Sequence, residues 1–319
     1  MYTIRLFEPT DAEYEAVVAV ANATWPDEQD TVANWKHNDA NRTKGRLFQR
    51  FTVEDNTQTI VAEAACWESN WAYVAGKYLF EITVHPDYQD QEIEPLCYDH
   101  ILAFLSKREP KPTKLETYTR EDKSRRIAFL EDRGYKVMMR EANSQIDLAG
   151  YDFSPFEAVR QKVTAQGIDL LDLVETQARD KNWMKSNYDL HTAIVHDIPN
   201  TDEITPQPIE EFAKGYDHPN FLKEANFFAL DGDQWVGLST LWKDAVQTDK
   251  CWVGVTGILP SHRRRGIATA LKWLTFDYAR RNNIRYIVTE NEENNPMYDL
   301  NVALGFKPLP AWVTYRKEL

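Results

Sequence analysis

The sequence predicts a mixed α/β (α+β) fold built from two tandem domains, each a mixed β-sheet flanked by helices. Three observations lead to this prediction. The chain has 319 residues, and domains commonly span about 100 to 200 residues. Segments with the periodicity of strands alternate with segments that have the periodicity of helices. The same order of segments occurs twice, over residues 1–150 and again over residues 151–319.

The first domain begins with an alternating strand at 2–7. Thr10, with Glu13 three residues later, marks the start of a helix that ends near Trp25-Pro26. Asp55-Asn56 are turn-forming residues between two apolar runs and predict a hairpin. The other predicted elements are a helix at 31–41, the hairpin strands at 48–54 and 59–67, a strand at 78–84, a helix at 93–104, a strand at 114–118, a short helix at 127–130 and a strand at 136–148.

The second domain repeats this order after a helical segment at 151–166. Its predicted elements are a strand at 168–173, helices at 183–196 and 209–214, strands at 226–230, 235–242 and 252–259, a helix with Ile267, Leu271, Leu274 and Tyr278 on one face, a strand at 286–289, a helix at 294–304 and a terminal strand. Landmark residues support the repeat, because Pro26 to Pro86 spans 60 positions and Pro199 to Pro260 spans 61. We therefore expect two domains of the same architecture.

The composition is that of a globular protein, with 43% hydrophobic and 27% charged residues, which excludes a disordered or low-complexity chain. Fifty acidic residues against 37 basic ones give a net charge of -13. Such a surface repels phosphate backbones and anionic lipids. We therefore expect no nucleic-acid partner and no membrane partner.

The three cysteines, Cys66, Cys97 and Cys251, are scattered and form no CxxC pair. We expect them to be buried thiols, with no disulfide framework and no metal site. The first residues have the pattern of a strand and a helix rather than of a signal peptide. No apolar run approaches the roughly 18 residues needed to span a bilayer, so the prediction is a cytoplasmic protein.

The most informative segment is VGVTGILPSHRRRGIATALKWL, residues 253–274. An apolar strand ends at Leu259-Pro260, and a basic turn then opens an amphipathic helix. Unpaired amide groups and the positive end of the helix dipole favour an anion at such a point. Small residues at Gly266 and Ala268 let a phosphate approach the backbone. The segment therefore predicts an anion-binding site.

This segment resembles the acetyl-CoA site of the GNAT superfamily of N-acetyltransferases, whose pyrophosphate loop has the pattern Q/R-x-x-G-x-G/A. A second family motif follows at the expected distance, N-x-x-M-x-x-L-N-x-x-L-G-F over 294–306. The resemblance covers nearly all of 226–319 and implies that acetyl-CoA (CoA) is the cofactor. The residues that it implies for cofactor binding are Thr256, Gly257, Ile258, Arg263, Arg264, Arg265, Gly266, Ile267, Ala268, Thr269 and Asn294. Of these, Thr256–Ile258 lie on the strand that exposes backbone amides to pantetheine in the family, and Gly257 permits a bulge or a close backbone approach there.

The first half resembles the same fold, with its own strand end at Val84-His85-Pro86. The two small positions of the loop are occupied by Glu92 and Glu94, so we expect two carboxylates to point where a pyrophosphate would lie. Residues 1–150 are therefore interpreted as a degenerate GNAT domain, and 151–319 as the GNAT domain with the acetyl-CoA site. The arrangement is similar to that of tandem acetyltransferases of the mycothiol synthase type.

The proton-transfer groups depart from the family pattern. The resemblance implies a tyrosine as general acid at the position of Asn301, and Tyr298, one helical turn earlier, is the candidate to replace it; the alternative is an ordinary helix tyrosine. The family's glutamate base corresponds to Thr289, and strand alternation turns the neighbouring Glu290 to the opposite face. An ordered water or Asp197 is an equal candidate for the base. Three histidines, His191, His196 and His262, are expected to be surface or capping residues.

The resulting prediction is an acetyl-CoA-dependent N-acetyltransferase that acts on a small-molecule amine by direct attack in the second domain. Two alternatives stay open. One is a non-catalytic CoA-binding or sensory protein, which the missing tyrosine and glutamate favour. The other is a peptide or protein N-acetyltransferase that docks its substrate between the domains. The identity of the amine depends on loops near 26–45 and 197–224 and does not follow from the sequence.

Overall fold

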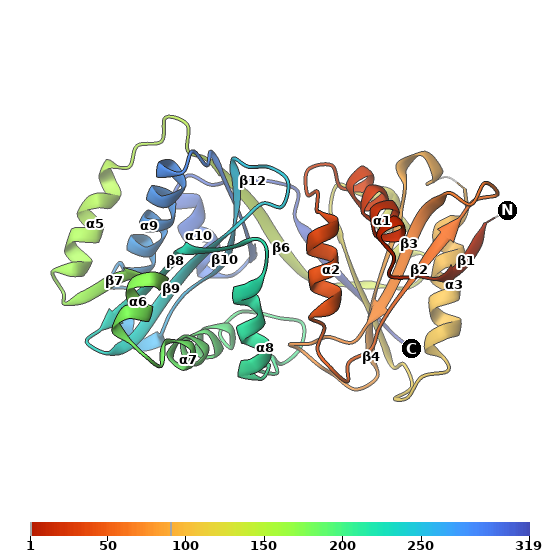
Figure 1. The fold of residues 1–319 in the computed structure, drawn as a ribbon, viewed down its shortest axis with the longest axis horizontal. Helices are drawn as coiled ribbons and strands as arrows, with labels where there is room; N and C mark the ends of the chain where they lie inside the picture. Colours follow the sequence, from red (N-terminus) through yellow and green to blue (C-terminus); the bar gives the residue numbers. More distant parts are fainter. Residues whose placement is uncertain (1, 90) are drawn as a thin grey trace. The chain divides into compact units, whose positions relative to one another are not determined.

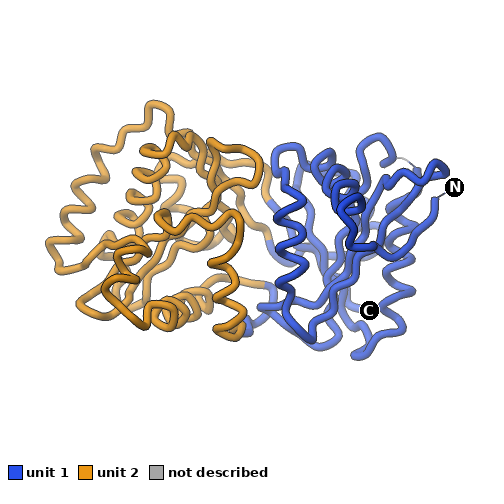
Figure 2. The backbone as a smooth tube through the Cα atoms, viewed as in Figure 1, with its two compact units in different colours: residues 1–139, 201–205, 312–319 blue, residues 140–200, 206–311 orange. Residues whose placement is uncertain are grey.

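A computed structural model describes residues 2–89 and 91–319. It divides the chain into two compact units (Figure 2). Unit 1 comprises residues 1–139, 201–205 and 312–319, and unit 2 comprises residues 140–200 and 206–311. Neither unit is a continuous stretch of chain, whereas the sequence analysis expects a single boundary near residue 150.

Unit 1 contains the strands β1 to β5, the helices α1 to α4 and the terminal strand β13 (Figure 1). Their bounds are β1 (Thr3–Leu6), α1 (Asp11–Thr24), α2 (Val32–Ala40), β2 (Phe48–Glu54), β3 (Ile60–Trp67), β4 (Lys77–Val84), α3 (Ile93–Leu105), β5 (Lys114–Arg120), α4 (Ser124–Glu131) and β13 (Trp312–Glu318). The strand order is β1-β2-β3-β4-β5-β13. Only the β4–β5 pair is parallel; the other neighbours are antiparallel.

One face of this sheet carries the apolar core of unit 1. Side chains such as Phe51, Phe80 and Leu115 are fully buried there against α3. The helix contributes Ile93, Cys97 and Ile101, which recur at helical spacing along one side. The opposite face, toward α1 and α2, is lined mainly by polar strand residues.

The terminal strand β13 is held in unit 1 by a buried charge cluster. The guanidinium of Arg316 donates from Nε to Oε2 of Glu116 on β5 at 2.8 Å. Arg316 also pairs with Asp202, and Nζ of Lys77 on β4 lies 2.7 Å from the same aspartate. Two cations and two carboxylates therefore compensate each other in a largely buried place, and removal of one partner would leave an uncompensated charge.

Unit 2 contains β6 to β12 and α5 to α10, with β6 beginning at the end of unit 1. The bounds are β6 (Lys136–Asp147), α5 (Ser154–Thr164), β7 (Ile168–Asp172), α6 (Leu173–Arg179), α7 (Trp183–Val195), α8 (Ile209–Ala213), β8 (Phe221–Asp231), β9 (Gln234–Lys243), β10 (Lys250–Ile258), α9 (Ile267–Arg281), β11 (Tyr286–Glu292), α10 (Pro296–Ala303) and β12 (Lys307–Pro308). The strand order is β6-β11-β10-β9-β8-β7, and β12 pairs with β6.

The sheet of unit 2 is covered on both faces. One face packs on α5 and α9 through residues such as Val163, Ile267 and Leu271. The other packs on α6 and α7 through residues such as Leu173 and Ile194. As in unit 1, a run of antiparallel strands leads to a parallel pair, here β10 and β11, with a helix between them. The two units therefore share one architecture, as the repeated order predicts.

Most predicted elements are present. The side chain of Thr10 accepts a hydrogen bond from the backbone of Glu13, which confirms the predicted helix start. The predicted strand at 168–173 was too long, because Asp172 caps a helix, α6, that the sequence analysis does not contain. The strand predicted at 226–230 begins earlier, at Phe221. Within the described residues, no helix is long and apolar enough to cross a membrane.

Candidate active site

The N-terminus of α9 lies directly after β10 and a short turn. Gly266 is the N-cap residue of α9 and has φ +84°, a conformation that favours glycine. The first intrahelical bond runs from the amide of Ala270 to the carbonyl of Gly266, so the amides before Ala270 point out of the helix end. These groups and the helix dipole form a cradle for an anion.

Three arginines precede this cradle, and they differ in their partners. Arg263 donates from Nε to the carbonyl of Ile258 at 3.1 Å and also pairs with Asp197. Arg265 contacts Gln166 at 3.1 Å. The exposed Arg264 has no ion pair among the described residues. Arg264 is therefore the guanidinium with the smallest cost of turning toward a bound phosphate.

The strands β10 and β11 separate beside the cradle. Their parallel register comprises the pairs Lys250–Tyr286, Cys251–Ile287 and Trp252–Val288. Beyond Trp252, β10 continues to Ile258 along β9, and β11 continues to Glu292 along β6. The edge of β10 that faced β11 is thus released from that ladder, and its backbone groups require other partners.

Two glycines shape this part of β10. At Gly254 an added Cβ would lie 2.5 Å from Nε1 of Trp242, so a side chain there would collide with the indole. At Gly257 it would lie 2.2 Å from Cγ2 of Ile194 on α7. The register shift of β10 falls between Val253 and Thr256. Of the two roles expected for Gly257, the structure therefore shows the close approach, while the bulge is at 254–255.

A cavity of about 200 Å³ opens beside this bulge. Its walls are aromatic, and it also contains Asn187, His191 and the bulge residues Gly254 and Val255. The aromatic members are Phe212, Tyr216, Phe221 and Trp242. Tyr216 is edge-on to Phe221 at 4.9 Å between ring centroids, and its hydroxyl accepts from the amide of Asn187. Among the described lining residues there is no carboxylate.

His191 lies on α7 and faces this cavity, 5.0 Å from Phe212 between ring centroids. Burial lowers the pKa of His191 to about 4. The imidazole is therefore neutral near pH 7 and carries an acceptor nitrogen. The surface or capping role that the sequence predicts for His191 is therefore wrong. The signal that was available is the spacing of Asn187 and His191, one turn apart on a helix that ends at a loop expected to govern the substrate.

Several proteins of known structure resemble this chain. A tandem GNAT protein from the clavulanic acid biosynthesis pathway matches with a TM-score of 0.75 and 15% identity, covering 100% of this chain and 98% of that one. A GCN5-related N-acetyltransferase from Sphaerobacter thermophilus matches with a TM-score of 0.71 and 16% identity, covering 99% and 95%. At these identities the likeness establishes the fold. Residues 192–306 also match the sequence profile of the acetyltransferase (GNAT) family. Residues 192–306 thus match the GNAT family, and the whole chain has the fold of tandem GNAT structures.

The same fold extends to a further type of acyltransferase. Saccharomyces cerevisiae N-myristoyltransferase, solved with bound myristoyl-CoA, matches this chain with a TM-score of 0.61 and 10% identity, covering 99% of this chain and 79% of that one. No curated protein sequence gives a significant match.

The second motif, residues 294–306, contains α10. Asn301 is fully buried, and its Nδ2 donates to Oδ1 of Asn291 on β11 at 2.6 Å. Its backbone carbonyl accepts from the amide of Phe306 at 3.0 Å. Asn301 thus ties α10 to β11 and to the chain that follows. Tyr298 is half-buried on the same helix. Asn294 is exposed and donates to Oε1 of Glu292 at 2.7 Å, and the N-cap of α10 is Asn295.

The other candidates for proton transfer differ in their burial and in their partners. Thr289 is buried and Glu290 is exposed, as strand alternation predicts. Asp197 pairs with Arg263 rather than standing free. His262 is buried between Ser261, 2.8 Å from Nδ1, and Asp231, 3.2 Å from Nε2, which is a structural role. His196 is the exposed C-cap of α7.

Helix α9 also carries one buried amine, that of Lys272. Lys272 is 1% exposed, and its Nζ has no hydrogen-bond partner among the described residues. The amine lies 5.6 Å from the ring centroid of Phe306. Burial lowers the pKa of Lys272 to about 7.

In the corresponding loop of unit 1, only one of the two glutamates lies as the sequence predicts. Glu92 is the N-cap residue of α3, with φ +58°. Glu94 does not point at the helix end; its carboxylate is buried and paired with Arg126 on α4. Because burial favours a compensated charge, Glu94 joins α3 to α4. The obstruction in this loop therefore rests on Glu92 alone.

Proposed function

We propose that this GNAT protein is an acetyl-CoA-dependent N-acetyltransferase that acts on a small-molecule amine in unit 2. The observation that carries the proposal is that β10 borders both the place proposed for the thioester and the aromatic cavity. The strand leaves β11 after Trp252, and Gly254 and Val255, two and three residues later, line the aromatic cavity. A thioester held on the free edge of β10 would meet an amine in that cavity.

The residues of unit 2 fit an acyl-CoA. The amides at the start of α9 and Arg264 would hold the pyrophosphate, with Gly266, Ile267, Ala268 and Thr269 forming the turn of backbone around it. Thr256, Gly257 and Ile258 are the proposed contacts for the pantetheine arm, and Arg263, Arg265 and Asn294 the proposed flanking contacts. When bound, acetyl-CoA would supply an activated acyl group.

The cavity prepares the amine for attack. An aromatic cavity with no lining carboxylate among its described residues disfavours an ammonium ion, so the pKa of a bound amine falls. The neutral imidazole of His191 would accept the proton that the amine loses. Backbone amides released from the β10–β11 ladder would donate to the developing oxyanion. Tyr298 is the proposed acid, and Asn301 the residue that positions α10 relative to β11.

The test is an acetyl-CoA-dependent screen of amines, amino acids, aminoglycosides and polyamines that follows both CoA release and the mass of the acetylated product. Turnover of a small amine, lost in His191→Gln, supports the proposal. CoA binding without transfer to any class would favour a non-catalytic CoA-binding protein. Turnover only on peptides would favour a peptide N-acetyltransferase.

A further inference from the structure

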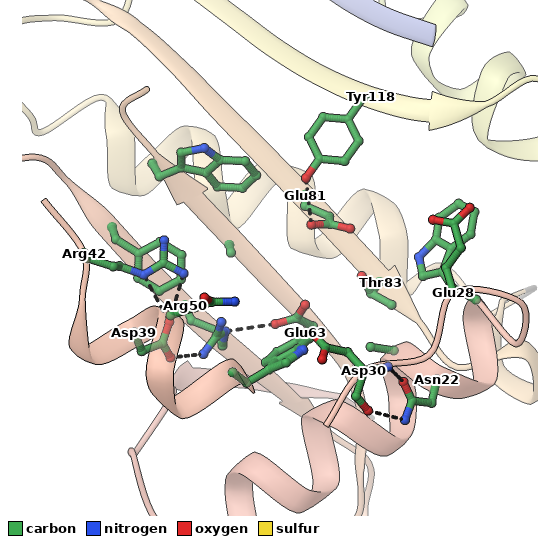
Figure 3. A pocket seen from close by; sticks show the side chains of 17 residues that line it. Asn22, Glu28, Asp30, Asp39, Arg42, Arg50, Glu63, Glu81, Thr83 and Tyr118 are labelled. Atoms are coloured by element: carbon green, nitrogen blue, oxygen red, sulfur yellow. Dashed lines mark hydrogen bonds and ion pairs between the residues drawn. The ribbon is translucent and has the colours of Figure 1, made fainter. Parts of the chain in front are cut away.

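A cavity larger than the one in unit 2 lies in unit 1, which lacks the phosphate loop. It has a volume of about 490 Å³ and lies between the sheet and the helices α1 and α2 (Figure 3). The strand register explains why polar side chains line this cavity. Arg50 is opposite Ala65, Ala65 is opposite Glu81, and Glu63 is opposite Thr83. These residues therefore share one face of the sheet, the face away from the apolar core.

The two arginines in this cavity share the carboxylate of Asp39. Asp39 lies 2.9 Å from Arg42 and 2.6 Å from Arg50, as the dashed lines in Figure 3 indicate. Arg50 also contacts Glu63, so these two arginines and two carboxylates together carry no net formal charge. Asp30 accepts a hydrogen bond from a neutral donor, Nδ2 of Asn34, at 2.7 Å.

Two further carboxylates are not compensated to the same degree. Glu63 is 5% exposed and shares Arg50 with Asp39, with 3.1 Å between Oε2 and Nε, and this Oε2 has no hydrogen-bond partner among the described residues. Glu81 accepts from the hydroxyl of Tyr118 at 3.4 Å, a long contact. Burial raises the pKa of Glu63 to about 7 and also raises the pKa of Glu81. Glu63 therefore shares its cation with Asp39, and Glu81 has no ion pair among the described residues.

Aromatic side chains complete the site beside Glu81. Trp67 and Tyr118 are edge-on to each other, 6.5 Å apart between ring centroids, and both line the cavity together with Trp25. Aromatic faces attract cations and pack against apolar groups. The buried carboxylate of Glu63 and the half-buried one of Glu81, next to such rings, are therefore complementary to a cation that carries an apolar body.

We propose that the cavity of unit 1 binds an organic ammonium ion, with its charged group at Glu63 and Glu81 and its apolar part against Trp67 and Tyr118. The proposal is independent of acetyl transfer in unit 2. It also assigns a ligand to the unit that lost its phosphate loop.

The test is isothermal titration of the full chain with phenethylammonium at pH 7, in parallel with its neutral isostere 2-phenylethanol. Hydrogen bonds to charged groups predict that the alcohol binds about tenfold to a hundredfold more weakly. Glu81→Gln and Glu63→Gln should weaken phenethylammonium by a similar factor. Glu15→Gln, which removes an exposed charge on α1, is the matched control and should bind as the parent does.

A second measurement addresses Glu63 itself. Binding of the cation would favour the ionised carboxylate, so titrations in buffers of different ionisation heat should report proton release near pH 6.5, and Glu63→Gln should abolish it. Equal affinity for phenethylammonium and 2-phenylethanol would overturn the proposal even if a variant failed to fold. Unchanged affinity in both folded glutamine variants would overturn it too, because the ligand would then lie outside this cavity.

Discussion

Gly266 and Glu92 are the N-cap residues of α9 and α3, and both have left-handed backbone conformations, with φ of +84° and +58°. The backbone turn before the helix is therefore retained in both units, and the difference lies in the side chain. A glycine leaves the helix amides of α9 open, whereas a carboxylate stands at the start of α3. The charge at that point favours a cation and repels a phosphate.

One CoA should therefore bind per chain. Only α9 combines an open N-terminus with preceding arginines among the described helices. Isothermal titration with CoA should give a stoichiometry of one. Two equivalent sites would show that Glu92 does not block the loop of unit 1.

Gly266→Glu should abolish CoA binding in a folded chain. Glu92 shows that a glutamate adopts this backbone conformation, and a left-handed residue other than glycine costs roughly 1–2 kcal/mol. Gly232→Glu is the matched control, since Gly232 also has positive φ and open space around its Cα. Circular dichroism checks the fold and titration checks the affinity; retained affinity in folded Gly266→Glu would place the pyrophosphate elsewhere.

His191→Gln should lower kcat by about 10² to 10⁴. Because the pKa of His191 is lowered to about 4, the parent should keep its base form down to about pH 5. The depressed pKa also has a stability consequence: between about pH 4 and 6.5 the unfolded chain binds the proton and the folded chain does not, so stability falls as pH falls through this window. Urea unfolding at pH 7 and pH 5 should show a larger loss for the parent than for the variant. An equal loss would contradict the burial of this imidazole, and full activity of the variant would remove its role as base.

Tyr298→Phe should lower kcat by about 10² to 10⁴ with little change in CoA affinity if Tyr298 protonates the leaving thiolate. Tyr286→Phe is the control on the neighbouring strand. Asn301→Ala should instead lower the melting temperature, because it breaks the bond to Asn291. A silent Tyr298→Phe would mean that water protonates the thiolate and that positioning supplies the rate.

Lys272→Met should stabilise the chain by about 1 to 4 kcal/mol at pH 7, because it replaces a buried amine with an apolar side chain of similar length. The pKa of Lys272 is lowered to about 7. Between pH 7 and about 10 the unfolded chain holds the proton and the folded chain does not, so the stability of the parent should rise with pH and the variant should lose this rise. Lys162→Met, at an exposed position on α5, is the control. A destabilised Lys272→Met would indicate that the amine has a partner.

The sequence predicted what depends on local pattern. The helix start at Thr10, the hairpin around Asp55 and the anion cradle before Ile267 all follow from residues close together in the chain. It did not predict what depends on contacts between distant segments. His191 and Phe212 meet only because α7 and α8 fold toward each other. The sequence predicts that Glu94 faces the loop, but its carboxylate pairs with Arg126, which is 32 residues away in the chain.

The place of β13 has a consequence for synthesis of the protein. Trp312–Glu318 pairs with β5, although the whole of unit 2 is translated between the two strands. At about 5–20 residues per second, a ribosome needs roughly 10 to 40 s to proceed from the end of β5 to the end of β13. During this interval β5 lacks this neighbour, and Glu116 and Asp202 lack Arg316. A strand made after unit 2 thus completes the sheet of unit 1, which makes the nascent chain vulnerable to pairing with another copy until β13 has been synthesised.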